Sequence, residues 1–312
     1  MSRKFAIGTD IGGSHISCAM IDLEKGAIVP GSRSFLAVDN RAPAEAILGV
    51  FSKALSGSMS HVGINRLAGI GFAMPGPFDY AGGIARFTPE VEKYEHLCNV
   101  DVATRLRDIM GLPPDCPLRF MNDASAFAVG EAWLGEARGF SRSVSVTLGT
   151  GFGSAFVENG IPVVEGVHVP ANGCFWHLPF NGRIADDSFS SRWFVNQYYI
   201  RCGIRAEGVK EIAGRAATDP RAMELFEEFG TNLGNFSAPW LSLFGAGVLI
   251  IGGNISGAYN LFGNYLQDSL KKQNLRIQIT LSGLREDAAI TGSARMLDET
   301  FWQRIQPVVA KM

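Results

Sequence analysis

The sequence lacks the features that mark several large classes of protein. No apolar run reaches the roughly 18 to 20 residues that a membrane-spanning helix needs. The N-terminus, Met-Ser-Arg-Lys, has neither the apolar stretch nor the small-residue cleavage site of a secretory signal. Lys and Arg number 28 against 30 Asp and Glu, so the basic excess of a nucleic-acid-binding protein is absent. We therefore expect a cytoplasmic protein that binds neither membranes nor nucleic acids.

Cysteine is scarce, and two common nucleotide-binding motifs are missing. The five cysteines, at positions 18, 98, 116, 174 and 202, form no Cys-x-x-Cys pair, which predicts free thiols in a reducing compartment. There is no GxxxxGKS or GxxxxGKT segment, so a P-loop is excluded. The turn GTGFGS at 149–154 departs from the dinucleotide-binding fingerprint, because Ser154 replaces the third glycine and a strand-like segment follows.

Glycine, in contrast, is abundant. It accounts for 37 of the 312 residues without a collagen-like repeat, which indicates tight turns and close backbone approaches. Apolar residues make up 46% of the chain, enough for a buried core. Strand-like runs alternate with helical patterns throughout, which is typical of an α/β protein. In the later part of the chain we expect helices at about 187–202, 220–235, 258–273 and 287–305, and strands at 247–252 and 276–281. At roughly 150 residues per domain, the length suggests about two domains.

A strand, a Gly-rich turn and a second strand occur twice, about 140 residues apart. The first copy spans 5–22 and the second 143–157, and a polar turn follows each, at 24–26 and at 158–160. The repeat indicates an internally duplicated protein with a ligand between its halves. Two unrelated Gly-turned hairpins would give the same pattern, so the pattern alone leaves both interpretations open.

Three Gly-rich turns are candidate phosphate sites, because consecutive backbone N–H groups in such turns favour an anion. In the first turn Asp10 precedes Gly12 and Gly13, and a carboxylate there suits Mg²⁺ held between it and phosphate oxygens. An Asx-turn, in which Asp10 bonds its own backbone, is the open alternative. The turn at 149–151 is the second candidate. The third, at 250–257, follows a strand and is either a nucleoside contact or only a tight turn.

Asn122 and Asp123 stand where a buried strand meets a helix. Ligands of open α/β sheets bind beyond the carboxyl ends of such strands. An ionised Asp at this place could accept the proton of a substrate hydroxyl that attacks a γ-phosphate. The alternative is that the pair only caps the helix, since Asn and Asp are preferred N-cap residues.

Taken together and in this order, the segments resemble the ROK family of sugar kinases, within the hexokinase and actin-like ATPase superfamily. The matching segments are GTDIGGS (8–14), GIGFAMPGPFD (69–79), FMNDASAFAVGEAWLG (120–135), VTLGTGFGSAFVENG (146–160), LIIGGNIS (249–256) and DAAITGSARML (287–297). They extend over nearly the whole chain. A single segment is weak evidence, whereas six in order are strong.

The resemblance implies a fold and an activity. The fold would be α/β, a two-domain duplicated actin-like ATPase, or ribonuclease H-like, fold with a central cleft. Residues 1–118 plus 291–312 would form the smaller domain and residues 119–290 the larger. The activity would be ATP-dependent transfer of the γ-phosphate to the 6-hydroxyl of a hexose of the glucose or N-acetylhexosamine class, with Mg²⁺ bound with ATP. Dimers are common in the family, so a homodimer fits the resemblance, although no segment marks an interface.

The resemblance also implies roles for particular residues. Asp123 would be the catalytic base, and Asp10 would position Mg²⁺, directly or through water. The implied substrate-binding residues are Gly76, Asn122, Asp123, His177 and Asp186. The implied nucleotide- and phosphate-binding residues are Asp10, Gly12, Gly13, Ser14, Thr147, Gly149, Thr150, Gly151, Gly252, Gly253 and Asn254.

The sequence departs from the family around Cys174. Family members commonly carry Glu-x-x-His, a cysteine-rich zinc loop and a second Glu. Here Cys174 takes the first Glu position, His177 fits the His, and Asp186 aligns with the second Glu. We expect no structural zinc, because Cys174 and His177 supply at most two of four ligands. Trp176 is either a sugar-stacking residue or part of the core. The acceptor sugar therefore stays open, and a catalytically weak or inactive sugar- and nucleotide-binding sensor is the alternative function.

Overall fold

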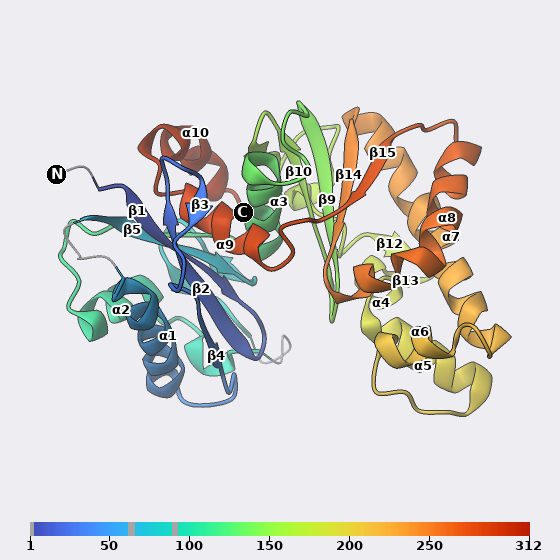
Figure 1. The fold of residues 1–312 in the computed structure, drawn as a ribbon, viewed down its shortest axis with the longest axis horizontal. Coiled ribbons are helices and arrows are strands. Elements are labelled where there is room, and N and C mark those ends of the chain that lie inside the picture. Colours follow the sequence, from blue (N-terminus) through green and yellow to red (C-terminus); the bar gives the residue numbers. More distant parts are fainter. Residues whose placement is uncertain (1–2, 62–65, 89–92) are drawn as a thin grey trace. The chain divides into compact units, whose positions relative to one another are not determined.

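The chain folds into two compact units, each with its own sheet (Figure 1). The computed structural model describes residues 3–61, 66–88 and 93–312. Unit 1 comprises residues 1–135 and 286–312, and unit 2 comprises residues 136–285. These bounds differ from the domains expected from sequence, because 119–135 and 286–290 join the first unit.

Unit 1 is built on a six-stranded sheet in which β3, β2, β1, β5 and β8 follow one another and β4 pairs with β2. The strands are β1 (Phe5–Ile11), β2 (His15–Asp22), β3 (Ala27–Ile28), β4 (Ser34–Ala37), β5 (Leu67–Met74) and β8 (Leu118–Asn122). β1 and β2 form an antiparallel hairpin, whereas β1, β5 and β8 run parallel. The carboxyl ends of β1, β5 and β8 therefore meet at one edge of the sheet.

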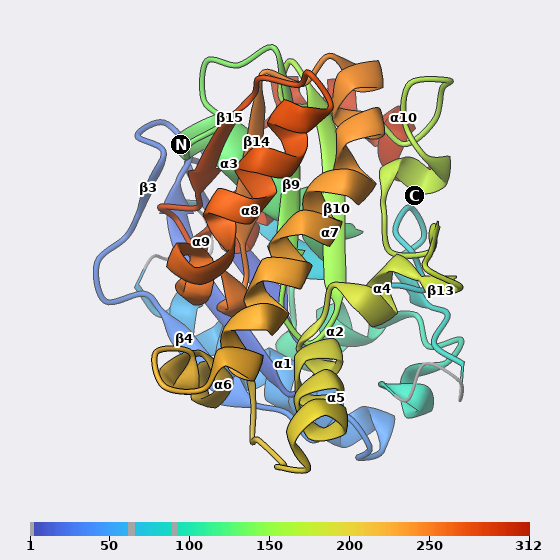
Figure 2. The same cartoon turned by 90° about the vertical axis from the view of Figure 1, so that its right-hand side faces the viewer.

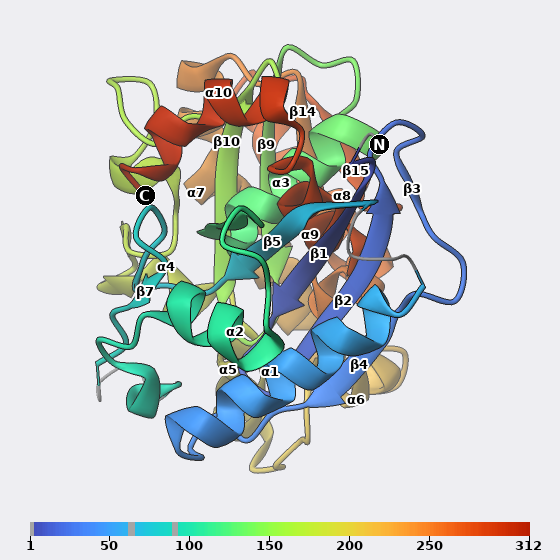
Figure 3. The same ribbon diagram turned by 90° about the vertical axis from the view of Figure 1, so that its left-hand side faces the viewer.

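Helices pack around this sheet. Figure 3 shows α1 (Ala44–Met59) and α2 (Val102–Met110) side by side in front of the strands. The other helices of the unit are α3 (Asp123–Leu134), α9 (Asp287–Arg295) and α10 (Glu299–Val309). The short elements are β6 (Phe78–Asp79), β7 (Ile84–Ala85) and the 3-10 helix η3 (Glu95–Leu97).

Unit 2 contains a five-stranded sheet in the order β11, β10, β9, β14 and β15. Its strands are β9 (Arg142–Leu148), β10 (Phe152–Glu158), β11 (Ile161–Pro162), β14 (Val248–Gly252) and β15 (Gln278–Leu281), with a small hairpin of β12 (Pro179–Phe180) and β13 (Arg183–Ile184). Its helices are α4 (Ala185–Ser188), α5 (Ser191–Cys202), α6 (Val209–Arg215), α7 (Pro220–Phe244) and α8 (Tyr259–Lys272), with the 3-10 helices η4 (Ala171–Gly173) and η5 (Asn254–Ala258). Figure 2 shows α7 and α8 side by side across one face of the sheet. Among the described residues, no helix combines the length and apolar character that a membrane crossing requires.

The two sheets share one topology, which confirms the duplication predicted from the repeated hairpin. In unit 1 the hairpin β1–β2 is extended on one side by β3 and on the other by the parallel strands β5 and β8. In unit 2 the hairpin β9–β10 is extended by β11 and by β14 and β15 in the same way. Each unit therefore presents a Gly-rich turn between the first two strands of its sheet.

Helix α9 explains why α3 and the C-terminal segment belong to unit 1. It packs on α3 and on strands β1 and β5. Glycines allow this close packing: a Cβ at Gly130 of α3 would overlap the carbonyl oxygen of Ala288, and one at Gly292 of α9 would overlap that of Ala126. Any larger residue at either position would force the helices apart, so these glycines hold α3 to the sheet of unit 1.

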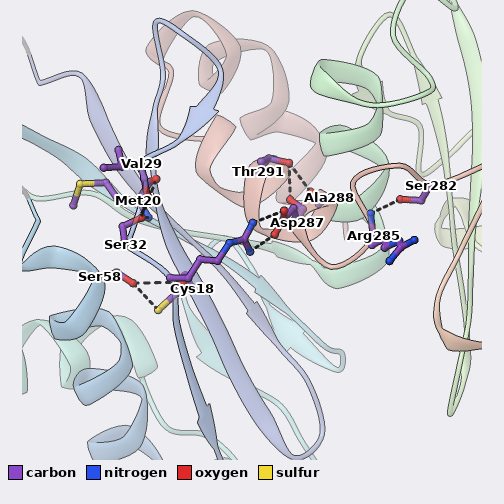
Figure 4. Close-up of polar contacts among 11 residues, drawn as sticks. Cys18, Met20, Val29, Ser32, Ser58, Ser282, Arg285, Asp287, Ala288 and Thr291 are labelled. Carbon is purple, nitrogen blue, oxygen red and sulfur yellow. Dashed lines mark hydrogen bonds and ion pairs between the residues drawn. The ribbon is translucent and has the colours of Figure 1, made fainter.

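Polar contacts fix α9, and Figure 4 shows those of its N-terminal part. Asp287, its first residue, forms an ion pair with Arg33, and Thr291 Oγ1 donates to the carbonyl oxygen of Asp287 at 2.7 Å. Further along, Ser293 Oγ accepts a hydrogen bond from the N–H of Thr9 at 2.9 Å. The helix is thus attached to β1 immediately before Asp10, the first of the candidate site residues.

Candidate active site

The carboxyl ends of three parallel strands bring the predicted residues of unit 1 to one edge of the sheet. Asp10 of β1 is in register with Ala73 of β5, and Met74 of β5 is in register with Asn122 of β8. The first Gly-rich turn follows β1, and Asp123 follows β8. The position matches the general rule for ligand sites of open α/β sheets.

The first Gly-rich turn exposes two consecutive amide groups. Two of its carbonyl oxygens accept hydrogen bonds from side chains: Tyr94 OH donates to Gly12 O at 2.6 Å, and Asn40 Nδ2 donates to Gly13 O. In the described part of the chain, no acceptor meets the N–H groups of Gly13 and Ser14. Adjacent unbonded amides of this kind form an anion-binding concavity. The turn therefore has the chemistry of a phosphate site.

The second turn, between β9 and β10, repeats this arrangement. Gly149 N–H donates to Gly151 O at 3.0 Å, and Gly149 O accepts from Ser191 N–H at 2.8 Å. Of the residues that the structure describes, none accepts a hydrogen bond from the N–H groups of Thr150 and Gly151. Both copies of the hairpin thus present, at the same position, a pair of amides that have no acceptor among the described residues.

The third Gly-rich turn lies against the end of β9. Gly252 is in parallel register with Thr147, so these two predicted residues are neighbours. Gly253 has a φ of 80°, and a Cβ there would overlap the carbonyl oxygen of Leu148. Only glycine fits this position. Asn254 follows as the first residue of η5. The backbone of the third turn is therefore held beside the second.

Asn122 and Asp123 have different partners. Asn122 is the N-cap of α3, since its side-chain oxygen accepts from Ser125 N–H at 3.1 Å. Asp123 Oδ1 accepts from Ala124 N–H at 2.8 Å and from Asn122 Nδ2 at 3.1 Å. Asp123 Oδ2 accepts no hydrogen bond from another described residue. Asn122 therefore caps the helix. One oxygen of Asp123 is available to accept a proton, or a hydrogen bond from a hydroxyl group.

Burial raises the pKa values of both aspartates, and neighbouring negative charges raise that of Asp10 further. Burial raises the pKa of Asp123, although the N–H of Ala124 and the charge of Lys93 act against it. Burial, and then the charges of Asp123 and Glu286, raise the pKa of Asp10 to about 7. This excess of negative charge suits a divalent cation. The described residues contain no cluster of three or more Asp, Glu, His and Cys ligands, so Mg²⁺ would complete its shell with water and phosphate oxygens.

Tyr80 links the predicted sugar residues of unit 1. Its hydroxyl donates to Met74 O at 3.1 Å and accepts from Asn122 Nδ2 at 3.4 Å. A Cβ at Gly76 would lie 3.3 Å from the same hydroxyl. Gly76 and Asn122 are therefore neighbours of one tyrosine, a residue that the sequence interpretation did not select.

Cys174 and His177 lie together in unit 2. Cys174 Sγ is 3.7 Å from His177 Nδ1, and burial raises the pKa of the thiol to about 11. The thiol is therefore neutral near pH 7 and cannot replace the charge of a carboxylate. Trp176 is 49% exposed and meets the His177 ring at a centroid distance of 5.4 Å. It is a surface residue and not part of the core.

Asp186 supports the second turn. Its Oδ1 accepts from Phe152 N–H at 2.6 Å, and its Oδ2 forms an ion pair with Arg192. A Cβ at Gly151 would lie 3.0 Å from Oδ1. The carboxylate predicted to contact the sugar is thus engaged at the phosphate turn, and its role toward a sugar stays a prediction.

Comparison with known proteins decides the family. The model of the ROK family matches residues 6–183, more than half of the chain. The chain belongs to the ROK family. A glucokinase of Thermotoga maritima is 25% identical over 96% of this ROK chain and 99% of its own length.

Solved ROK structures share the fold. A ROK family glucokinase from Streptomyces griseus, solved in complex with glucose and AMPPNP, has a TM-score of 0.73 and 22% identity, covering 94% of this chain and 98% of its own. A ROK family transcriptional regulator has a TM-score of 0.78 and 17% identity, covering 98% of this chain and 81% of its own. The actin-like ATPase fold expected from the sequence is thereby confirmed.

Several residues at the site of this ROK chain carried no signal in the sequence. Tyr94 and Asn40 hold the carbonyl oxygens of the first turn, and Arg192 pairs with Asp186 at the second. Each comes from a segment without a Gly-rich or Asn-Asp pattern. Only the folded chain brings them to the turns, so no local motif could have identified them.

Proposed function

We propose that the protein is an ATP-dependent sugar kinase, which transfers the γ-phosphate to the 6-hydroxyl of a hexose of the glucose or N-acetylhexosamine class. The observations that carry this proposal are two Gly-rich turns, each with a pair of amides that have no acceptor among the described residues, and an Asp at the strand end beside the first turn. Membership of the ROK family, and the glucokinases among its members, support it.

Each turn would bind part of the nucleotide. The amides of Gly13 and Ser14, and those of Thr150 and Gly151, would donate to phosphate oxygens. Gly252, Gly253 and Asn254 would line the adenosine pocket, with Thr147 beside them. Mg²⁺ bound with ATP would supply positive charge at the phosphates, and Asp10 would hold it, directly or through water.

Asp123 would act as the base. Its Oδ2 would accept the proton of the sugar 6-hydroxyl as that oxygen forms a bond to the γ-phosphorus. The bond from the γ-phosphorus to the β,γ-bridging oxygen would break, and ADP would leave. Asn122 would orient a sugar hydroxyl through the side chain that also contacts Tyr80. Gly76 and His177 would complete the sugar contacts, whereas Asp186 would support the second phosphate turn through its hydrogen bond from Phe152 N–H.

A second candidate is a sensor that binds sugar and nucleotide with little or no turnover. Cys174 favours it, because its neutral thiol stands where family members commonly carry a carboxylate and is a weak hydrogen-bonding group. A transcriptional regulator with the same fold also supports it, because it shows that the ROK family includes regulators as well as kinases.

A sugar panel separates the two candidates. ADP release with Mg-ATP would be measured with glucose, mannose, fructose, allose, N-acetylglucosamine and N-acetylmannosamine. A kinase gives a rate that depends on one or more of these sugars. A sensor gives calorimetric binding of sugar and Mg-AMPPNP without sugar-dependent ADP release, and that outcome would replace the kinase proposal.

A further inference from the structure

Lys93 lies at the first phosphate turn. A Cβ built on Gly13 would be 3.4 Å from Lys93 Cε and 4.0 Å from its Nζ. Across the described ranges of the chain, the Lys93 ammonium group makes neither a hydrogen bond nor an ion pair, although surface lysines such as Lys4 and Lys271 do. An ammonium group with no partner among the described residues, close to two such amides, would be a third donor to an anion bound at the turn.

The neighbouring Tyr94 fixes the backbone from which Lys93 extends. Its side chain is fully buried, its hydroxyl donates to Gly12 O, and its ring lies 5.6 Å from that of Phe87 and 6.1 Å from that of Phe51 between centroids. Its φ is 54°, an uncommon backbone conformation for a tyrosine. A residue keeps such a conformation only where its surroundings hold it there. The turn and Lys93 are thus joined by a rigid contact.

Lys93 also lies within electrostatic reach of the proposed base. Its positive charge lowers the pKa of Asp123, against the effect of burial. Lys93 therefore contacts the turn on one side and influences the Asp123 carboxyl on the other. These are the two groups that the transferred phosphoryl group would have to approach together.

We propose that Lys93 binds the transferred phosphoryl group together with the amides of Gly13 and Ser14, and stabilises its charge during transfer. This inference rests on the proposed kinase function. In this step Lys93 acts only as a hydrogen-bond donor and transfers no proton. The 6-hydroxyl proton goes to Asp123, the oxygen–phosphorus bond to the sugar forms, and the bond to the bridging oxygen of ADP breaks.

The test compares Lys93→Met and Lys93→Arg with a matched control, Lys53→Met, which removes an exposed lysine of α1. Loss of one donor to transition-state charge lowers kcat by roughly 100- to 1,000-fold. We expect that loss for Lys93→Met, with the KM for the sugar changed by less than about threefold. Lys93→Arg should retain at least about a tenth of the wild-type kcat, and Lys53→Met should match the wild type. If Lys93 had only a structural role, Lys93→Met would lower stability but would not lower kcat selectively while leaving the KM for the sugar unchanged.

Binding of magnesium tripolyphosphate, measured by calorimetry, separates this inference from the kinase proposal. Should the wild type release no ADP with any sugar, the kinase proposal fails, but an affinity at least about tenfold weaker in Lys93→Met still supports Lys93 as a phosphate ligand. Unchanged tripolyphosphate affinity in Lys93→Met overturns it, as does a kcat within about threefold of an active wild type. Lys93→Gln, which keeps a polar side chain, serves if Lys93→Met does not fold.

Discussion

The carboxyl group of Asp10 is withdrawn from solvent and lies near the negative charges of Asp123 and Glu286, and this gives it a distinctive pH dependence. Its pKa in the folded protein is about 7, whereas an Asp in an unfolded chain has a value of about 4. Folding therefore takes up a proton between these pH values, and the protonated group favours the folded state. The contribution to the free energy of unfolding is complete below about pH 4 and is lost as the pH rises through about 7.

Asp10→Asn should abolish this decrease in stability with rising pH, because an Asn side chain does not ionise. We expect the variant to be more stable than the wild type at pH 8.5, by an amount of the order of 1–4 kcal/mol, and the difference to shrink at pH 5. Urea unfolding at both pH values measures it. Asp187→Asn, at an exposed position of α4, is the control and should follow the wild type. Equal pH dependence in Asp10→Asn and the wild type would contradict a buried Asp10 carboxyl group near other carboxylates.

Asp186 gives a second test at the residue scale. Asp186→Asn weakens the hydrogen bond from Phe152 N–H and leaves Arg192 without its ion pair. Hydrogen bonds to charged groups contribute about 1.5–3 kcal/mol, so we expect the KM for ATP to rise roughly 10- to 100-fold. The KM for the sugar should change by less than about threefold in steady-state kinetics. A rise in the KM for the sugar with an unchanged KM for ATP would show instead that Asp186 contacts the sugar.

Sequence patterns predicted some of these residues and could not predict others. Asn122 and Asp123 were visible because they follow a buried strand, but only the hydrogen bonds show that Asn122 is the cap. Tyr94 is 82 residues from Gly12, whose carbonyl it holds, and no local pattern joins the two. Residues that belong to a local turn motif can be predicted from the sequence, whereas residues that tertiary packing brings to the turn cannot.

At the scale of elements, hydrophobic periodicity predicted the strands and hairpins well but misjudged some helix bounds. One helix was expected over 287–305, and the structure has two, α9 and α10. Asp298 separates them because its carboxylate caps α10, accepting from Phe301 N–H at 2.8 Å. The helix expected over 220–235 continues to Phe244, because Pro239 does not end it. The seven-residue α6 has too few turns to show a period.

The crossing of α3 and α9 is the element contact most sensitive to a single methyl group. Gly292→Ala would place a Cβ on the carbonyl oxygen of Ala126. We expect a loss of about 1–3 kcal/mol in the free energy of unfolding, the usual cost of overpacking, measured by urea denaturation. Gly214→Ala is the control, since a Cβ there meets nothing within 4 Å in α6 and should leave stability unchanged or raise it by up to about 1 kcal/mol. Similar effects of the two substitutions would contradict the close crossing.

At the scale of the whole molecule, the duplication was predictable and the boundaries of the units were not. The repeated hairpin signalled two related sheets, and both have the same strand order. The first boundary depends on α9, which packs on α3 although the whole of unit 2 lies between them in the sequence. Local sequence patterns cannot predict a contact between two helices that are so far apart in the chain.

Nucleotide binding should stabilise the molecule in a way that depends on Asp10 and on Mg²⁺. A ligand at a hundred times its dissociation constant adds about 2.7 kcal/mol to the free energy of unfolding. We therefore expect Mg-AMPPNP to raise the Tm in differential scanning calorimetry. Asp10→Asn should lose much of this gain, and so should the wild type in excess EDTA. A Tm gain of equal size in all three samples would exclude a magnesium-dependent phosphate site at Asp10.

The central claim is that Asp123 accepts the proton of the sugar hydroxyl while other residues bind the substrates. The measurement that tests it most directly compares wild type and Asp123→Asn for formation of sugar phosphate from Mg-ATP, followed by ³¹P NMR, with calorimetric sugar affinity measured in parallel. We predict that Asp123→Asn retains sugar affinity within a few-fold and that its rate falls by at least about 100-fold. A variant that keeps more than a few per cent of the wild-type rate would contradict the account.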